Sequence, residues 1–130
     1  MPHWTSFITL LAVLVYFWAD LRVSKARGDY KIKAPAIAGD PNFERIFRSH
    51  QNMMEWMPIF LPSLWLFALY ISDIWAALVG LVWVVGRVLY LVAYAQAADK
   101  RGLGFAIQAS ASTILFFGAA AGVIRALAMG

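Results

Sequence analysis

The sequence of 130 residues contains no cysteine, and this absence limits the chemistry open to the protein. It excludes disulfide cross-links, thiolate metal sites and enzymes that work through their own pair of thiols. If the protein uses thiol chemistry, the thiol must therefore come from a substrate. Histidine is also scarce. His3 and His50 are the only two and lie far apart in the sequence, so we expect no metal site.

Charged side chains are also few. They make up 14% of the residues, whereas 62% are hydrophobic. Soluble domains are usually about a quarter charged and about half apolar, so the composition indicates an integral membrane protein. The net charge of +4 does not indicate a nucleic-acid partner. The basic residues lie beside hydrophobic segments, as in the loops of membrane proteins, and no nucleic-acid-binding motif is present.

Four long apolar segments follow one another along the chain. Each is close to the roughly 20 residues that a helix needs to span a membrane, and helices are the default because lipid offers no partner to backbone groups. Basic residues follow the first segment rather than precede it, so we expect a retained helix and not a signal peptide. The sequence predicts one membrane domain over residues 1–130, with helices at about 4–24, 43–71, 74–98 and 102–128.

The connections between these segments differ in length. A polar stretch at about 25–42, with two glycines and two prolines, is the one long loop. The stretches "YISD" at 70–73 and "DKRG" at 99–102 are short turns. Short turns make neighbouring helices antiparallel, so the predicted fold is all-α, a four-helix up-down transmembrane bundle.

The basic residues predict the orientation in the membrane. Seven surround the first loop: Arg22, Lys25, Arg27, Lys31, Lys33, Arg45 and Arg48. Lys100 and Arg101 lie at the third connection, on the same side, and the other side has only Arg125. Loop 25–42 and turn 99–102 should therefore face the cytoplasm, with both termini opposite. The membrane would be the inner one in a bacterium and an internal one in a eukaryote.

Polar residues form a stripe on each of two neighbouring predicted helices. Arg48, Asn52 and Glu55 stand at positions i, i+4 and i+7 and share one face. The second stripe consists of Arg87, Tyr90 and Tyr94, and Arg101 falls within about 60° of it. His50 lies off the first stripe, where it could meet a neighbouring subunit or solvent. Ionisable groups in membrane segments are costly, which makes both stripes candidates for function.

Two interpretations of these stripes are open. Glu55 and Arg87 could form an ion pair that only holds the helices together. The whole set, however, contains more cations than anions, which favours an anionic partner. A small ligand with carboxylates fits, because a guanidinium can bind a carboxylate through two parallel hydrogen bonds. Lipid headgroups are the competing anion.

Two stretches resemble a known family. "NFERIFRSHQNMMEWMPIFL" at Asn42–Leu61 and "VGRVLYLVAYAQAADKRGL" at Val85–Leu103 are similar to the second and third helices of the MAPEG family, membrane-associated proteins in eicosanoid and glutathione metabolism. The histidine of "RSHQN" and the run "VGRV" are closer to the microsomal glutathione transferase and prostaglandin-synthase-like branch of the family than to the leukotriene-synthase-like branch. The resemblance implies a homotrimer that binds glutathione, as co-substrate, at its subunit interfaces near the cytoplasmic side.

The resemblance also implies roles for individual residues. Arg101 matches the arginine that catalytic members use to stabilise the glutathione thiolate. A nearby guanidinium lowers the pKa of a thiol, so this role is chemically sound. Trp56 stands where leukotriene-synthase-like members have tyrosine, which puts one ligand contact in doubt. The residues expected to bind glutathione are Arg27, Arg48, His50, Asn52, Glu55, Arg87, Tyr90 and Tyr94.

The predicted function is a membrane glutathione transferase acting on lipophilic electrophiles, with reduction of lipid hydroperoxides as a second activity of the same thiolate. Neither branch of the family is matched throughout, so its eicosanoid substrates are not carried over. A different class of function is a non-catalytic protein of the same fold that binds and presents lipids. A third is a small transporter with Glu55 and Arg87 along its pathway. Retention of both Arg101 and Glu55 favours the enzyme.

Overall fold

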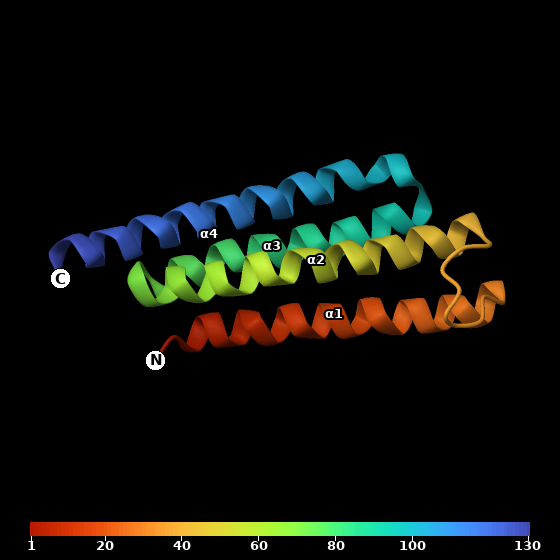
Figure 1. Cartoon of the computed structure of the whole chain (residues 1–130), viewed down its shortest axis with the longest axis horizontal. Helices are drawn as coiled ribbons and strands as arrows, with labels where there is room; N and C mark the ends of the chain where they lie inside the picture. Colours follow the sequence, from red (N-terminus) through yellow and green to blue (C-terminus); the bar gives the residue numbers. More distant parts are fainter.

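The computed structural model describes residues 1–130 as a bundle of four long helices (Figure 1). They are α1 (His3–Tyr30), α2 (Pro41–Tyr70), α3 (Asp73–Gln96) and α4 (Gly102–Met129), and a short 3-10 helix, η1 (Ala98–Arg101), joins α3 to α4. Both termini lie at one end of the bundle, and the α1–α2 loop and η1 lie at the other. All four helices are long and apolar enough to cross a membrane. The prediction of an all-α, four-helix up-down bundle is confirmed.

The first helix is longer than the sequence suggested. It continues to Tyr30 instead of ending near residue 24, so the α1–α2 loop covers residues 31–40 and not 25–42. Polar residues do not stop a helix, and Lys25 pairs with Asp29 one turn later at 3.1 Å. The helix stops at Lys31, whose φ of 57° is left-handed and ends the run of helical hydrogen bonds.

The helix starts show how the chain satisfies its free backbone donors. In α2, the Asp40 carboxylate accepts from the Asn42 N–H at 2.8 Å, and Pro41 follows at the first helical position. The N-terminus of α1 has no side-chain cap of its own. Asp73, at the start of α3, instead accepts from the backbone N–H groups of Trp4 and Thr5, at 3.2 and 2.8 Å.

This cap between two helices gives a first prediction. Asp73→Ala should lower the midpoint of thermal unfolding in detergent by a few degrees, because it leaves two donors at the start of α1 without their acceptor. Asp99→Ala is the matched control, since Asp99 is exposed and forms no side-chain hydrogen bond in the structure. Equal midpoints for the two variants would contradict the capping role.

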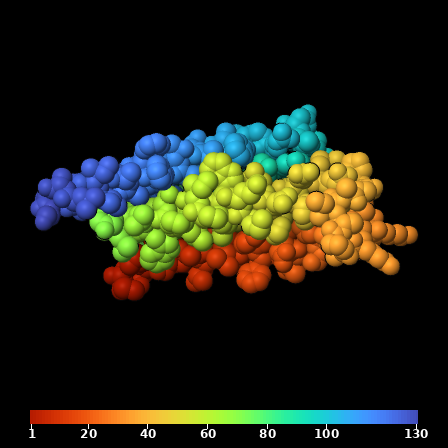
Figure 2. Space-filling view, in the orientation of Figure 1, coloured from red at the N-terminus to blue at the C-terminus, as the bar shows by residue number.

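Large apolar side chains and glycines hold the bundle together. Phe60 of α2 stacks on Trp83 of α3 with ring centroids 3.8 Å apart, and neither residue is exposed. Helices α3 and α4 are close enough for their backbones to meet, since a Cβ on Gly104 would lie 2.4 Å from the backbone nitrogen of Tyr90. Small residues permit such backbone contact between membrane helices. The last turns of α4 project beyond the α2–α3 turn (Figure 2).

Candidate functional site

A polar pocket of about 380 Å³ opens at the end of the bundle that carries η1. Helix α2 contributes four of its side chains, α3 contributes two, and Arg101 closes it at the end of η1. The seven residues that line it are Arg48, Gln51, Asn52, Glu55, Tyr90, Tyr94 and Arg101. Six of the nine residues expected from the sequence therefore meet in one place. We call this site the polar pocket.

Helical spacing explains the α2 wall of the polar pocket. Residues 48, 52 and 55 recur at intervals of four and three, which places them on one face of a helix. Gln51 completes the same i, i+3, i+4, i+7 pattern and also lines the pocket, although it is not among the residues predicted from the sequence. The signal was present, since Gln51 is three residues from Arg48 and four from Glu55.

The two tyrosines and Arg101 form the opposite wall. The Tyr90 and Tyr94 rings meet edge to face, with centroids 5.4 Å apart. The Arg101 guanidinium carbon lies 5.3 Å from the centre of the Tyr94 ring, and its Nη1 donates to the carbonyl oxygen of Ala98 at 2.9 Å. Arg101 is exposed and has no carboxylate partner, so its charge is free to act on a ligand.

Arg87 lies behind the polar pocket rather than in its wall. It is fully buried, and its Nη1 donates to Oδ1 of Asn52 at 2.8 Å while its Nη2 donates to the backbone oxygen of Ser49 at 3.4 Å. Its guanidinium carbon is also 4.4 Å from the centre of the Tyr90 ring. Arg87 thus supports two residues of the pocket wall from the protein interior.

The structural ion pair between Glu55 and Arg87 is absent. The only ion pair between an arginine or lysine and a carboxylate is Lys25–Asp29, and His50 lies 3.5 Å from Asp20 in a contact that is an ion pair only when the histidine is protonated. Arg87 is occupied by neutral oxygen acceptors, and Glu55 is exposed at the pocket. The interpretation in which these two residues merely hold the helices together is therefore wrong.

Arg27 and His50 lie away from the polar pocket of their own chain. Arg27 donates through Nη1 to the carbonyl oxygen of Ala36 at 2.7 Å, which ties the α1–α2 loop to the end of α1. The Nε2 of His50 is 3.5 Å from an Asp20 oxygen, and its ring stacks on Tyr16 with centroids 5.2 Å apart. Both residues therefore belong to the α1–α2 side of the bundle.

Trp56 also stays outside the pocket lining. It packs edge to face against Phe105 of α4, with ring centroids 5.6 Å apart, and Phe105 in turn lies 6.2 Å from Tyr90. The indole therefore joins α2 to α4 beside the pocket. In this position it supports the pocket wall through packing.

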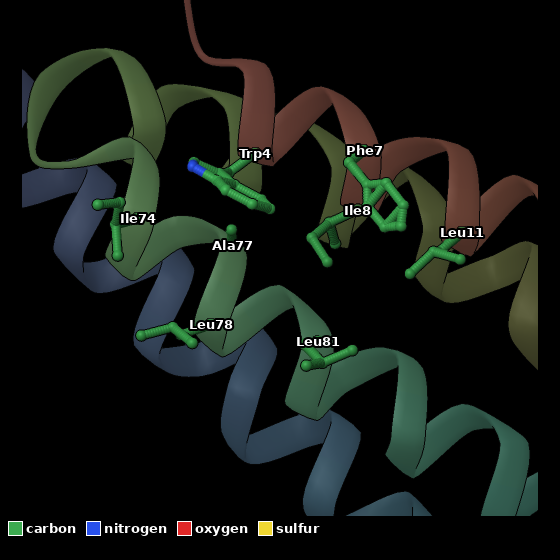
Figure 3. A pocket seen from close by; sticks show the side chains of 8 residues that line it. All are labelled: Trp4, Phe7, Ile8, Leu11, Ile74, Ala77, Leu78 and Leu81. Atoms are coloured by element: carbon green, nitrogen blue, oxygen red, sulfur yellow. The ribbon is translucent and has the colours of Figure 1, made fainter.

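A second depression in the surface is entirely apolar (Figure 3). It measures about 420 Å³ and runs between α1 and α3 at the end of the bundle that carries the termini. Its lining is Trp4, Phe7, Ile8, Leu11, Ile74, Ala77, Leu78 and Leu81. It offers no polar side chain for chemistry and lies at the opposite end from the polar pocket, as expected of a surface that contacts lipid chains.

Comparison with known proteins agrees with this architecture. The sequence model of the MAPEG family matches residues 5–121. The chain is 44% identical to an uncharacterized protein of Synechocystis over 89% of this chain and 85% of that protein. It is 38% identical to human microsomal glutathione S-transferase 2 over 89% and 79%. It is also 38% identical to bovine leukotriene C4 synthase, over 72% and 63%. The chain belongs to the MAPEG family and is a multi-pass integral membrane protein.

Proposed function

We propose that the protein is a membrane glutathione transferase that binds glutathione in the polar pocket and ionises its thiol. The observation that carries the proposal is the pocket itself, whose lining combines two arginines without carboxylate partners with one glutamate and two tyrosines. Glutathione carries two carboxylates, one ammonium group and one thiol, and these groups complement that set. A relative in the same family, human microsomal glutathione S-transferase 2, bears this activity in its name.

Each part of the pocket has a chemical role in this proposal. Arg48 binds a carboxylate of glutathione, because a guanidinium matches a carboxylate fork. Glu55 accepts from the ammonium group. Arg101 lies next to the sulfur and stabilises the thiolate over the thiol. The tyrosine hydroxyls and the Asn52 amide donate hydrogen bonds that fix the peptide, and Arg87 holds Asn52 from behind.

The thiolate then reacts with a lipophilic electrophile. It forms a carbon–sulfur bond while a leaving group departs with its electron pair, or it adds to an activated alkene whose neighbouring carbon takes up a proton. With a lipid hydroperoxide, the sulfur attacks the terminal oxygen: an S–O bond forms, the O–O bond breaks, and the alkoxide leaves and takes a proton from water to become the alcohol. A second glutathione then converts the resulting glutathione sulfenic acid to a disulfide and water. Arg101 is at the exposed end of the bundle, where glutathione enters from the cytoplasm and the lipophilic substrate from the bilayer.

The proposed assembly is a homotrimer whose sites lie between subunits. The residues expected to bind glutathione lie on two different sides of the subunit, and this separation supports the proposal. The polar pocket occupies the α2–α3 side, while Arg27 and His50 lie on the α1–α2 side. In a closed ring, one surface of each subunit meets the other surface of the next. Arg27 and His50 would therefore complete the pocket of the neighbouring subunit.

Mixing two defective variants tests this arrangement. Arg27→Ala and Arg48→Ala subunits should each form trimers with weak glutathione binding. Co-expression at equal amounts should restore about a quarter of the sites, because each mixed ring contains one interface in which both surfaces are intact. Calorimetric titration of the purified trimers measures the number of restored sites. Recovery would be absent if all the residues acted within one chain.

A non-catalytic lipid-binding protein is the second candidate, and the apolar groove of Figure 3 is the observation that favours it. Two measurements on the purified protein separate the candidates. The proposed enzyme binds glutathione in calorimetry and conjugates it to a generic aryl halide. Retained lipid without any glutathione binding would favour the alternative, and flux in proteoliposomes would be needed to support a transporter.

A further inference from the structure

Five polar atoms in the bundle interior have no hydrogen-bond partner within the chain. They are Nε1 of Trp83, Nε of Arg87, Nε2 and Oε1 of Gln108, and Oγ of Ser112. The four side chains are between 0 and 2% exposed, so lipid and bulk water do not reach them. Buried polar atoms are nearly always partnered by protein or by ordered water, because an unpartnered one costs free energy. Five such atoms together therefore indicate hydrogen bonds beyond those within the chain.

The two helices that carry these atoms face each other at one level. Trp83 and Arg87 are one turn apart on α3, and Gln108 and Ser112 are one turn apart on α4. A Cβ on Gly86 would lie 2.8 Å from the backbone nitrogen of Gln108, so the helices touch beside Arg87. The chemistry is complementary, because the indole and guanidinium only donate, whereas the Gln108 oxygen and the serine hydroxyl can accept.

The hydrogen bonds of Arg87 indicate what this interior set is for. Two of its nitrogens bind Asn52 and Ser49, and its Nε is the one nitrogen left without an acceptor. Since Oδ1 of Asn52 accepts from Arg87, its NH₂ group remains to donate into the polar pocket. The hydrogen bond from Arg87 thus holds the Asn52 oxygen toward the interior and leaves the NH₂ group for a ligand.

We propose that Gln108 is a positioning residue whose side-chain oxygen, through a water molecule held between α3 and α4, accepts from Nε of Arg87 and thereby orients Asn52 toward the ligand. Trp83 and Ser112 supply further hydrogen bonds to the same buried water. The proposal rests on the proposed function for the identity of the ligand, glutathione. It adds a residue from α4 that lies outside the polar pocket and has no contact with the ligand.

Replacement of Gln108 by methionine tests this role. Methionine has a similar length and no strong hydrogen-bonding group, so packing is kept while the acceptor is lost. We expect Gln108→Met to bind glutathione about tenfold more weakly in calorimetry. Gln96→Met is the matched control and should bind as the wild type does, because Gln96 is exposed at the end of α3. In turnover, KM for glutathione should rise more than kcat falls.

A second variant separates positioning from packing. Gln108→Glu keeps an acceptor that faces Arg87, so it should bind glutathione about as well as the wild type. If Gln108→Glu binds as weakly as Gln108→Met, or if Gln108→Met binds as tightly as the wild type, the proposal is wrong. Thermal unfolding gives a further distinction. The proposed hydrogen bond predicts a lower unfolding temperature for Gln108→Met, whereas removal of a buried amide without a partner would leave that temperature unchanged or raise it.

One measurement does not depend on glutathione. If the wild type binds no glutathione, the proposed function fails, and a double-mutant cycle of Arg87→Met and Gln108→Met in thermal unfolding still decides the proposed contact. We expect the double variant to lose less stability than the sum of the single losses, because both singles break one network. Additive losses would show that Gln108 and Arg87 act independently, which overturns the proposal.

Discussion

Arg101→Ala should reduce the rate of glutathione conjugation to an aryl halide by about 10²- to 10³-fold at neutral pH, the usual effect of removing one group that stabilises developing charge. Arg101 is exposed, its side chain forms one hydrogen bond, to the Ala98 carbonyl, and its guanidinium makes one cation–π contact, with Tyr94. Its loss should therefore leave the fold intact. The unfolding temperature, measured in parallel, should match that of the wild type.

The pH dependence of this variant identifies the mechanism. Without the guanidinium, the pKa of the bound thiol returns toward its ordinary value of about 8.5, so less thiolate is present at neutral pH. The deficit of Arg101→Ala should therefore narrow as pH rises toward that value. Lys100→Ala is the control for surface charge, because Lys100 is the neighbouring exposed cation. A deficit that is constant with pH, or equally large in Lys100→Ala, would contradict thiolate stabilisation by Arg101.

Gly104→Ala should destabilise the protein by about 1–3 kcal/mol, the usual cost of overpacking a tight interior. The added Cβ would lie 2.4 Å from the backbone nitrogen of Tyr90 and 2.8 Å from the backbone oxygen of Gly86. These are main-chain atoms, so the contact cannot be relieved by a side-chain rotation. Helix α4 must move away from α3, and because Tyr90 lines the polar pocket, glutathione affinity should fall as well.

Gly102→Ala provides the matched comparison for this substitution. Gly102 begins the same helix two residues earlier, and apart from its own chain neighbours and the backbone of that helix nothing lies within 4 Å of its added Cβ. The same chemical change should therefore be neutral or slightly stabilising there, since alanine favours helix more than glycine does. Chemical or thermal unfolding of both variants in one detergent measures the difference. Similar midpoints would show that α3 and α4 do not pack through Gly104.

The sequence predicted the parts of the site that a single helix determines. Arg48, Asn52 and Glu55 share a face because of their spacing alone, and that spacing brings them together in the structure. The polarity of the sequence does not predict where α1 ends. The polar residues after position 24 are typical of a loop, but a helix that has left the apolar layer can continue with its side chains in water.

Relations between helices could not be predicted in this way. In the sequence, Asp73 is only a charged residue in a predicted turn. The packing of α3 beside α1 brings its carboxylate to the backbone N–H groups of Trp4 and Thr5, which it caps. Gln108 is one amide in an apolar segment, and periodicity does not say which neighbour it faces. The spacing of Arg27 and His50 shows which face of its own helix each residue occupies. It does not show which surface lies opposite that face, because this depends on the assembly.

Ultraviolet difference spectroscopy of bound glutathione tests the central claim most directly, because a thiolate absorbs where a thiol does not. Purified wild-type protein titrated with glutathione at neutral pH should develop the thiolate band in proportion to occupied sites. Arg101→Ala should bind glutathione without the band until the pH is raised. Glutathione bound to the wild type as the neutral thiol, or no binding at all, would contradict the account.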